Sequence, residues 1–151
     1  MNPVPDVQRI LVPHDFSDAA ERALDYAVTL AKKFGARITL MHAYEIPSLG
    51  YPEALVASLE FSSDIERVVG KALEAIAARA RRSDVEIDAV LRLGRAWTEI
   101  LTVAEQTRAD LVVMGTHGRK GVSRALLGSV AEKIVRTAPC PVLTVHAASG
   151  G

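Results

Sequence analysis

Short apolar runs alternate with amphipathic segments along the chain, and this alternation constrains the fold more than any other sequence feature. Residues 9–13 form an apolar run ended by proline, which suits a strand buried on both faces. From Ala20 to Phe34 the apolar residues recur at helical spacing. Strands separated by helices imply right-handed crossovers and a parallel sheet. We therefore expect an α/β fold: a three-layer, open five-stranded parallel sheet with helices on both faces.

The same reading gives approximate boundaries for each element. The predicted strands span 9–13, 37–43, 85–93, 111–114 and 141–146, and the predicted helices span 20–34, 65–80, 97–104 and 129–137. Polar residues alternate with apolar ones in 85–93, which indicates an edge strand. Residues 45–63 contain two prolines and a glycine and are expected to form a long loop, in which 53–59 could add a helical turn. No repeat or linker divides the chain, so we expect a single domain over 1–151 with an ordered core over about 7–146.

The first helix carries signals at both ends. Ser17 or Asp18 can cap its start, and Glu21 could complete a capping box after Asp18. Gly35 can adopt the left-handed conformation that ends helices. The sequence therefore predicts a helix that begins directly after the loop following the first strand.

Charge and composition mainly exclude classes of partner. The 151 residues include 18 Lys plus Arg and 18 Asp plus Glu, so the formal net charge of zero argues against a nucleic-acid partner. No apolar run approaches the ~20 residues that span a bilayer, so no membrane partner is expected. The single cysteine, Cys140, cannot form an intrachain disulfide, which favours a cytoplasmic location. With 49% hydrophobic residues the chain can bury a core.

A glycine-containing segment after the fourth predicted strand is the most informative motif. Gly115-Thr116-His117-Gly118 is followed by nine residues and then by Gly128-Ser129-Val130, where a helix begins. In open parallel sheets, ligands bind beyond the carboxyl ends of the strands. Glycines allow a close backbone approach, and a helix start offers free amide protons. The segment is therefore predicted to be a phosphate cradle.

Three well-known nucleotide sites do not fit. A P-loop is excluded because the chain contains no Gly-Lys-Ser or Gly-Lys-Thr. A dinucleotide fingerprint is absent, since the first strand is followed by Pro13-His14-Asp15-Phe16 without glycine. The Ser-Gly-Gly-x-Asp-Ser loop of adenylyl-transferring ligases is absent from the same position.

The Gly-x-x-Gly, nine residues, Gly-Ser spacing matches the universal stress protein family at Gly115, Gly118, Gly128 and Ser129. The resemblance extends over nearly the whole chain, from Ile-Leu-Val-Pro-His-Asp-Phe-Ser at 10–17 to Pro-Cys-Pro-Val-Leu at 139–143. It implies a Rossmann-like domain of the adenine nucleotide alpha hydrolase type, with the first and fourth strands as neighbours. The motif resembles that of the ATP-binding branch.

This resemblance also implies a role for individual residues. Asp15 would contact the nucleoside, Ala43 would lie against adenine with Pro13 and Met114 nearby, and the glycine segment would hold ribose and phosphates. Ser129 and Val130 would donate to phosphate. The implied nucleotide-binding residues are Pro13, Asp15, Ala43, Met114, Gly115, Gly118, Arg119, Gly128, Ser129 and Val130. The ligand would be ATP, and Mg²⁺ bridging its phosphates is compatible with the sequence without being required by it.

Charge around the motif supports an anionic ligand. Residues 115–136 contain five Lys or Arg and one Glu, five minus one or plus four. A triphosphate is attracted by such a cluster. We expect Arg119 and Lys120 to contribute most.

Several alternatives stay open from the residues alone. Asp15 could cap the first helix, and His14 and His42 could be hydrogen bonded at the ends of strands. His117 could touch phosphate. No pair of histidines has metal-ligand spacing, and Cys140 has no adjacent basic residue that would activate it.

The predicted function is nucleotide binding in a stress-response or signalling module, and no catalytic residues are assigned. No set of groups suited to hydrolysis is visible. The alternatives are a nucleotide-independent homodimeric interaction protein, and a slow ATPase or related adenine-nucleotide enzyme. The fifth strand could be an exposed edge, and the resemblance implies a homodimer paired through Val142, Leu143, Thr144 and Val145.

Overall fold

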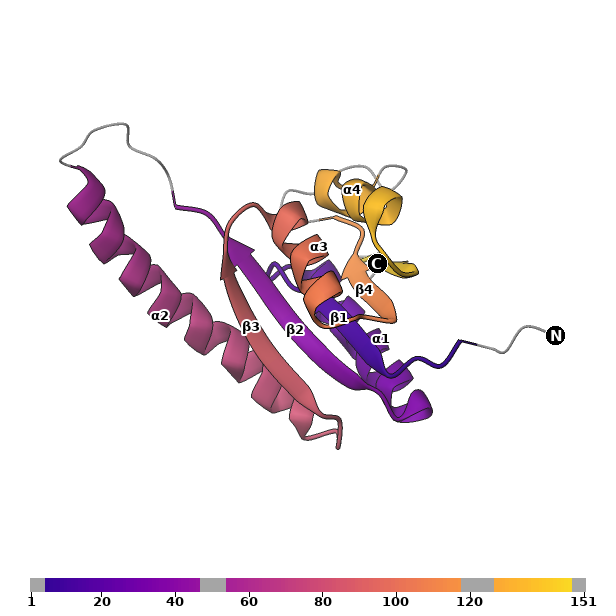
Figure 1. The fold of residues 1–151 in the computed structure, drawn as a ribbon. Helices are drawn as coiled ribbons and strands as arrows, with labels where there is room; N and C mark the ends of the chain where they lie inside the picture. The colour runs from indigo at the N-terminus through magenta and orange to yellow at the C-terminus, as the bar shows by residue number, and fades with distance from the viewer. Residues whose placement is uncertain (1–4, 47–53, 118–126, 148–151) are drawn as a thin grey trace.

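The computed structural model of the protein describes residues 5–46, 54–117 and 127–147. In order, its elements are β1 (Arg9–Pro13), α1 (Asp18–Phe34), β2 (Arg37–Tyr44), α2 (Ala54–Arg81), β3 (Ile87–Leu93), α3 (Ala96–Gln106), β4 (Leu111–Gly115), α4 (Ser129–Thr137) and β5 (Val142–Val145). Strands and helices alternate throughout, as the sequence predicts (Figure 1). Among the described residues, no helix has both the length and the apolar character needed to cross a membrane.

The strands form one parallel sheet with the order β3-β2-β1-β4-β5. The expected fold class is confirmed, and β1 and β4 are neighbours as the resemblance implies. Both β3 and β5 are edges, which agrees with the alternating pattern of the third strand and the expectation for the fifth. The chain builds outward from β1 through β2 to β3 and then returns to the other side of β1 with β4. The sheet therefore has its switch point between β1 and β4.

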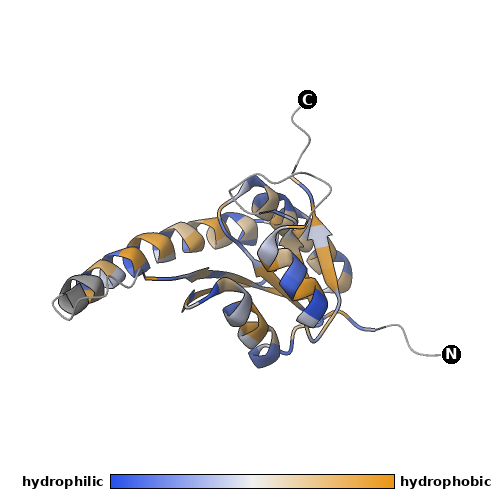
Figure 2. Ribbon diagram, turned by 90° about the horizontal axis from the view of Figure 1, so that it is seen from above, coloured by the Kyte–Doolittle hydropathy of each residue, from blue (hydrophilic) through white to orange (hydrophobic). Residues whose placement is uncertain are grey.

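Two hydrophobic cores cover the two faces of the sheet. Ile10 and Val12 of β1 belong to the core shared with α1 and α2, whereas Leu11 belongs to the core shared with α3 and α4. All three side chains are buried. Alternate residues of one strand thus fill opposite layers, because successive side chains of a strand point to opposite faces. Figure 2 shows hydrophobic and hydrophilic residues interspersed along the helices, as expected for helices with one face on the sheet.

Helix α1 begins and ends at two of the predicted residues. Ser17 is the N-cap, and its Oγ accepts a hydrogen bond from the amide of Ala20. Gly35 ends the helix with a φ of 68°. The expected capping box of Asp18 and Glu21 does not form, because the cap lies one residue earlier and the Glu21 carboxylate instead pairs with Arg79 of α2.

The predicted loop over 45–63 is wrong for residues 54–63, which belong to α2, although the helical turn that was allowed over 53–59 lies largely within this helix. The large apolar side chains described at this end of the helix do not face a core. Leu59 and Phe61 are 62% and 54% exposed. Helix α2 has 28 residues and runs along β3, with one end projecting beyond the sheet (Figure 1). At 1.5 Å per residue it extends for about 42 Å, well beyond the eight-residue strand β2 at about 26 Å.

Candidate functional site

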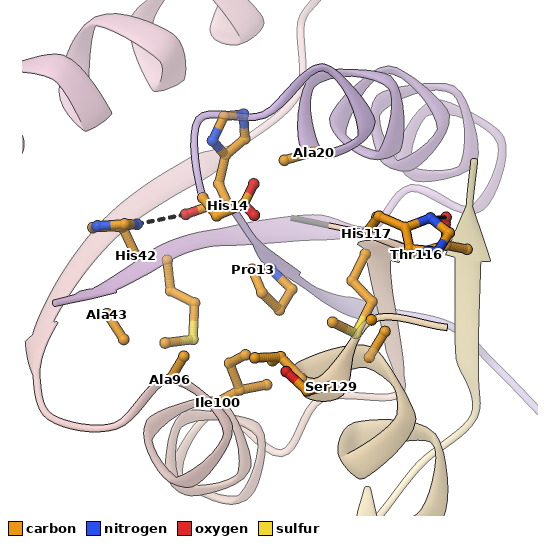
Figure 3. Close-up of a pocket in the computed structure, with 17 residues that line it drawn as sticks. Pro13, His14, Ala20, His42, Ala43, Ala96, Ile100, Thr116, His117 and Ser129 are labelled. Carbon is orange, nitrogen blue, oxygen red and sulfur yellow. Dashed lines mark hydrogen bonds between the residues drawn. The ribbon is translucent and has the colours of Figure 1, made fainter. Parts of the chain in front are cut away.

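A cavity of about 460 Å³ lies at the carboxyl ends of β1, β2 and β4, at the switch point of the sheet (Figure 3). This volume is within the range of small-molecule sites. Its lining residues come from the strand ends and from α1, α3 and α4: Pro13, His14, Asp15, Ala20, Met41, His42, Ala43, Ala96, Ile100, Met114, Gly115, Thr116, His117, Gly128, Ser129, Val130 and Ala131.

The structure brings most of the residues implied by the resemblance to this one cavity. Eight of them line it: Pro13, Asp15, Ala43, Met114, Gly115, Gly128, Ser129 and Val130. The remaining two, Gly118 and Arg119, lie outside the described residues. Segments more than a hundred residues apart in the chain therefore meet at a single site.

Much of the cavity lining is apolar. Ala43 from β2 and Ala96 and Ile100 from α3 lie near one another (Figure 3), and Met114 from β4 adds a further hydrophobic side chain. Such a surface suits a flat, weakly polar ring. Sequence reasoning did not assign Ala96 and Ile100 to the site. Ile100 also belongs to the core shared with α3 and α4, so its apolar character alone does not mark it as a site residue.

Asp15 also lines the cavity, from the loop between β1 and α1. Its Oδ1 accepts hydrogen bonds from the amide and the hydroxyl of Ser17. Its Oδ2 accepts no hydrogen bond from the described residues. Asp15 is therefore not the helix cap itself, since Ser17 fills that position, and it retains one carboxylate oxygen for other partners.

The N-terminus of α4 faces the cavity without a side-chain cap. The amide of Gly128 donates to the carbonyl of Thr116 at 2.7 Å, so the expectation that Gly128 offers a free amide is wrong. The amide of Glu132 is the first to bond within the helix, to Gly128 at 2.9 Å. The amides of Ser129, Val130 and Ala131 thus have no partner within the helix, and the helix dipole adds positive potential at the same end.

Gly115 is a glycine because helix α1 approaches it closely. A Cβ at Gly115 would lie 2.8 Å from the Cβ of Ala19 and 3.0 Å from its carbonyl carbon. No side chain fits between β4 and the first turn of α1. The glycine therefore allows the close packing that places the Asp15 loop beside the end of β4.

The predicted cluster of positive charge is only partly described. Arg136 pairs with Glu132 at 2.9 Å, and the Lys133 ammonium lies 4.3 Å from the centroid of the Trp97 ring. These two cations are engaged on α4 and α3, and no Lys or Arg is found among the described residues that line the cavity. Arg119, Lys120 and Arg124 lie outside the described residues. The positive potential visible at the site thus comes from the α4 N-terminus.

Two of the residues that line the cavity are His14 and His42. The Nδ1–H of His42 donates to the carbonyl of His14 at 2.7 Å (Figure 3). The side chain of His14 is fully buried. Burial lowers the pKa of His14, against the opposing influence of the carboxylates of Glu21 and Asp15. His14 is therefore a neutral imidazole at neutral pH.

Groups suited to covalent or metal chemistry are not gathered here. Burial raises the pKa of the Cys140 thiol, which makes it a poor nucleophile. Within 5–46, 54–117 and 127–147, no group of three or more His, Cys, Asp or Glu residues could hold a metal ion. The described arrangement is suited to binding: an apolar wall, one carboxylate and a set of backbone amides.

These features define a parallel α/β domain with a small-molecule cavity at its switch point. Residues 6–146 match the universal stress protein family, and the chain belongs to this family. It is 41% identical over 142 residues to a universal stress protein of Thermus aquaticus, a match that covers 91% of this chain and 97% of the relative.

Solved structures agree with the fold. The protein MJ0577 superimposes with a TM-score of 0.84 at 24% identity, covering 97% of this chain and all of that one. A universal stress protein solved in complex with cAMP superimposes with a TM-score of 0.71 at 25% identity, and 95% of this chain and all of that chain are covered.

Proposed function

We propose that this protein is an ATP-binding module whose nucleotide state serves a stress-response or signalling role. The observation that carries the proposal is the cavity, because it combines an apolar wall, the carboxylate of Asp15 and the uncapped start of α4. These three features suit, in turn, the adenine ring, the hydrogen-bonding groups of the nucleoside and the phosphates.

Each part of the nucleotide has a counterpart in the cavity. Adenine would lie against Ala43 and Ile100, and the free oxygen of Asp15 would accept a hydrogen bond from the nucleoside. Phosphate would accept hydrogen bonds from the amides of Ser129 and Val130, as anions do at helix N-termini. The structural relative in complex with cAMP supports an adenine nucleotide as the ligand class. Arg119 would add charge to the phosphate end, and Mg²⁺, when bound, would bridge phosphate oxygens.

The proposed activity is binding rather than catalysis. Phosphoryl transfer requires a positioned nucleophile and charge stabilisation at the transferring phosphate. Among the described lining residues Asp15 is the only carboxylate, and one of its oxygens already accepts two hydrogen bonds from Ser17. Slow hydrolysis of ATP is the alternative, and a phosphate-release assay on nucleotide-loaded protein distinguishes the two.

The test of ATP binding has two measurements. Protein purified from cells is denatured, and the released nucleotide is identified by mass spectrometry. Calorimetric titrations with ATP, cAMP and dAMP then rank the ligands. We expect ATP to bind most tightly, because its three phosphates carry the most negative charge and are attracted most strongly by the positive N-terminus of α4. Absence of both copurified nucleotide and a calorimetric response would leave the nucleotide-independent interaction protein as the better assignment.

We further propose a cytoplasmic homodimer paired through the outer edge of β5. In the sheet, β5 pairs only with β4. Leu143 is 38% exposed, and its strand offers backbone groups to a second copy. Antiparallel pairing of Val142–Val145 across a two-fold axis would cover them. Light scattering at micromolar concentration should give twice the chain mass of 16.2 kDa, and a monomer mass would contradict the pairing.

A further inference from the structure

His14 is a buried histidine with a defined tautomer. Its Nδ1 lies 3.0 Å from the backbone amide of Phe16. An amide can only donate, so Nδ1 carries the lone pair and the proton of the neutral ring is on Nε2. The side chain is fully buried. The ring therefore acts as an acceptor for the backbone two residues further along, inside the loop that carries Asp15.

The other ring nitrogen faces a carboxylate. Nε2 lies 3.3 Å from Oε1 of Glu21, without the alignment of a hydrogen bond. The other oxygen of Glu21 accepts a hydrogen bond from Arg79 at 2.5 Å. His14 is thus enclosed by α1 and, through Glu21, by α2. Burying a polar nitrogen without a hydrogen bond costs free energy. The His14 ring therefore stabilises the loop only if its hydrogen bond with the Phe16 amide outweighs this cost.

Phe16 shows why the bond is needed. Its φ is 64°, in the left-handed region that non-glycine residues rarely occupy. Its ring packs edge-on against His14, with centroids 5.5 Å apart, and in a tilted arrangement against His42, with centroids 4.7 Å apart. A strained residue persists only where its surroundings hold it. The hydrogen bond from the Phe16 amide to His14 and the contacts with these two rings hold Phe16 in place.

The Phe16 conformation controls the residues on either side of it. Asp15, just before, lines the cavity, and Ser17, just after, caps α1. Asp15 and Ser17 are also hydrogen bonded to each other. Any relaxation of Phe16 would therefore move the carboxylate of Asp15.

We propose that His14 is a positioning residue that holds Asp15 in its nucleotide-binding orientation by accepting the amide proton of Phe16. The inference rests on the proposed function, since Asp15 matters here as a ligand of the nucleoside. His14 itself acts through the loop and need not touch the nucleotide.

Protonation provides a readout that general packing would not give. An imidazolium ring has no lone pair on Nδ1, so it cannot accept from Phe16. The charged and titratable groups that surround the ring are Glu21 of α1, Asp15 of the same loop and His42 of β2, with Arg79 of α2 behind Glu21. Both carboxylates would favour the imidazolium, whereas burial and His42 oppose it. The bond to Phe16 is therefore retained at neutral pH and lost in acid.

Three proteins test the role of the acceptor. His14→Ala removes it. His14→Asn keeps it, because the amide oxygen of asparagine and Nδ1 of histidine are both attached to Cγ, but an amide is not protonated in acid. The control is Asp25→Asn, which changes an exposed side chain of α1 that does not line the cavity. Affinity for ATP is measured by calorimetry at pH 8 and at pH 5 for each variant and for the wild type.

We expect His14→Ala to bind ATP about tenfold more weakly at pH 8, and His14→Asn and the control to match the wild type. All of these proteins share the titration of ATP and of the other histidines, so those effects cancel in the comparison. At pH 5 the wild type and the control should therefore lose more affinity than His14→Asn, because only they lose the acceptor at position 14 by protonation. Equal affinity of His14→Ala and wild type overturns the role of His14, as does a His14→Asn variant as weak as His14→Ala. If His14→Ala does not fold, the comparison of wild type with His14→Asn at the two pH values decides. A wild-type protein that binds no adenine nucleotide at pH 8 would instead overturn the proposed function.

Discussion

Replacing Gly115 by alanine should destabilise the protein by overpacking the contact between β4 and α1. The new Cβ would lie 2.8 Å from the Cβ of Ala19 and 3.1 Å from the amide nitrogen of Ala20. Carbon atoms in contact are about 3.5 Å apart or more, so the helix would have to move by about 0.7 Å. The atoms in the way belong to the helix backbone and to a Cβ, and no flexible side chain can yield instead. Overpacking of this kind costs about 1–3 kcal/mol.

A matched variant, Gly70→Ala, should change the stability of the protein in the opposite direction. Gly70 is in the interior of α2, where a Cβ would lie 3.8 Å from Cδ2 of Leu91, an ordinary contact. Alanine there improves helix propensity by up to about 1 kcal/mol. Gly70→Ala should therefore stabilise the protein while Gly115→Ala destabilises it.

Thermal and urea unfolding of the two variants measures both effects. For a domain of this size, about 1 kcal/mol corresponds to a change in Tm of about 2–4 °C, so Gly115→Ala should lower Tm by about 2–12 °C. A Gly115→Ala protein as stable as the wild type would refute the packing argument, since it would mean that α1 can move away from β4 at no cost.

Three further predictions concern the cavity and its histidine. Gly128→Glu should abolish ATP binding with little change in Tm, because a carboxylate would compete for the phosphate position at the start of α4, and undiminished affinity in calorimetry would show that phosphate binds elsewhere. Asp15→Asn keeps an oxygen acceptor for Ser17 but removes the charge, so it should weaken binding of ATP and spare inorganic triphosphate; equal losses for both ligands would contradict the placement of Asp15 at the nucleoside. The pKa of His14 is lowered in the folded state from its ordinary value of 6.5 by burial, so below that pH the unfolded chain binds more protons and the free energy of unfolding should fall. In His14→Asn this component of acid destabilisation should be missing from urea titrations, and identical pH profiles would refute it.

The alternation of apolar strands and amphipathic helices was enough to predict the parallel sheet. The polar residues within the third strand indicated one of its edges, and the capping signal at Ser17 or Asp18 included the residue that caps α1. The loop prediction failed at residues 54–63, in a part of α2 that projects beyond the sheet. Leu59 and Phe61 are exposed there, so they do not form the core-facing apolar stripe from which a helix is predicted.

The candidate site, like the fold, was predicted from the sequence only in part. Spacing of the glycines predicted where the end of β4 and the start of α4 would lie, and eight of the ten implied residues line one cavity. The use of each backbone group could not be predicted. The amide of Gly128 is occupied by Thr116, and Gly115 makes room for α1.

The sequence by itself predicted the fold class and the family, because these follow from local periodicity and from motif spacing along the chain, and the family resemblance in turn implied that the first and fourth strands are neighbours. The tertiary structure alone decided which residues complete the cavity and what holds its carboxylate in place. Ile100 reaches the cavity from α3, and His14 accepts from Phe16 beneath Glu21 and Arg79. Ile100 and the strand ends, and Glu21 and Arg79, are far apart in the sequence, so these contacts exist only once helices have packed on both faces of the sheet.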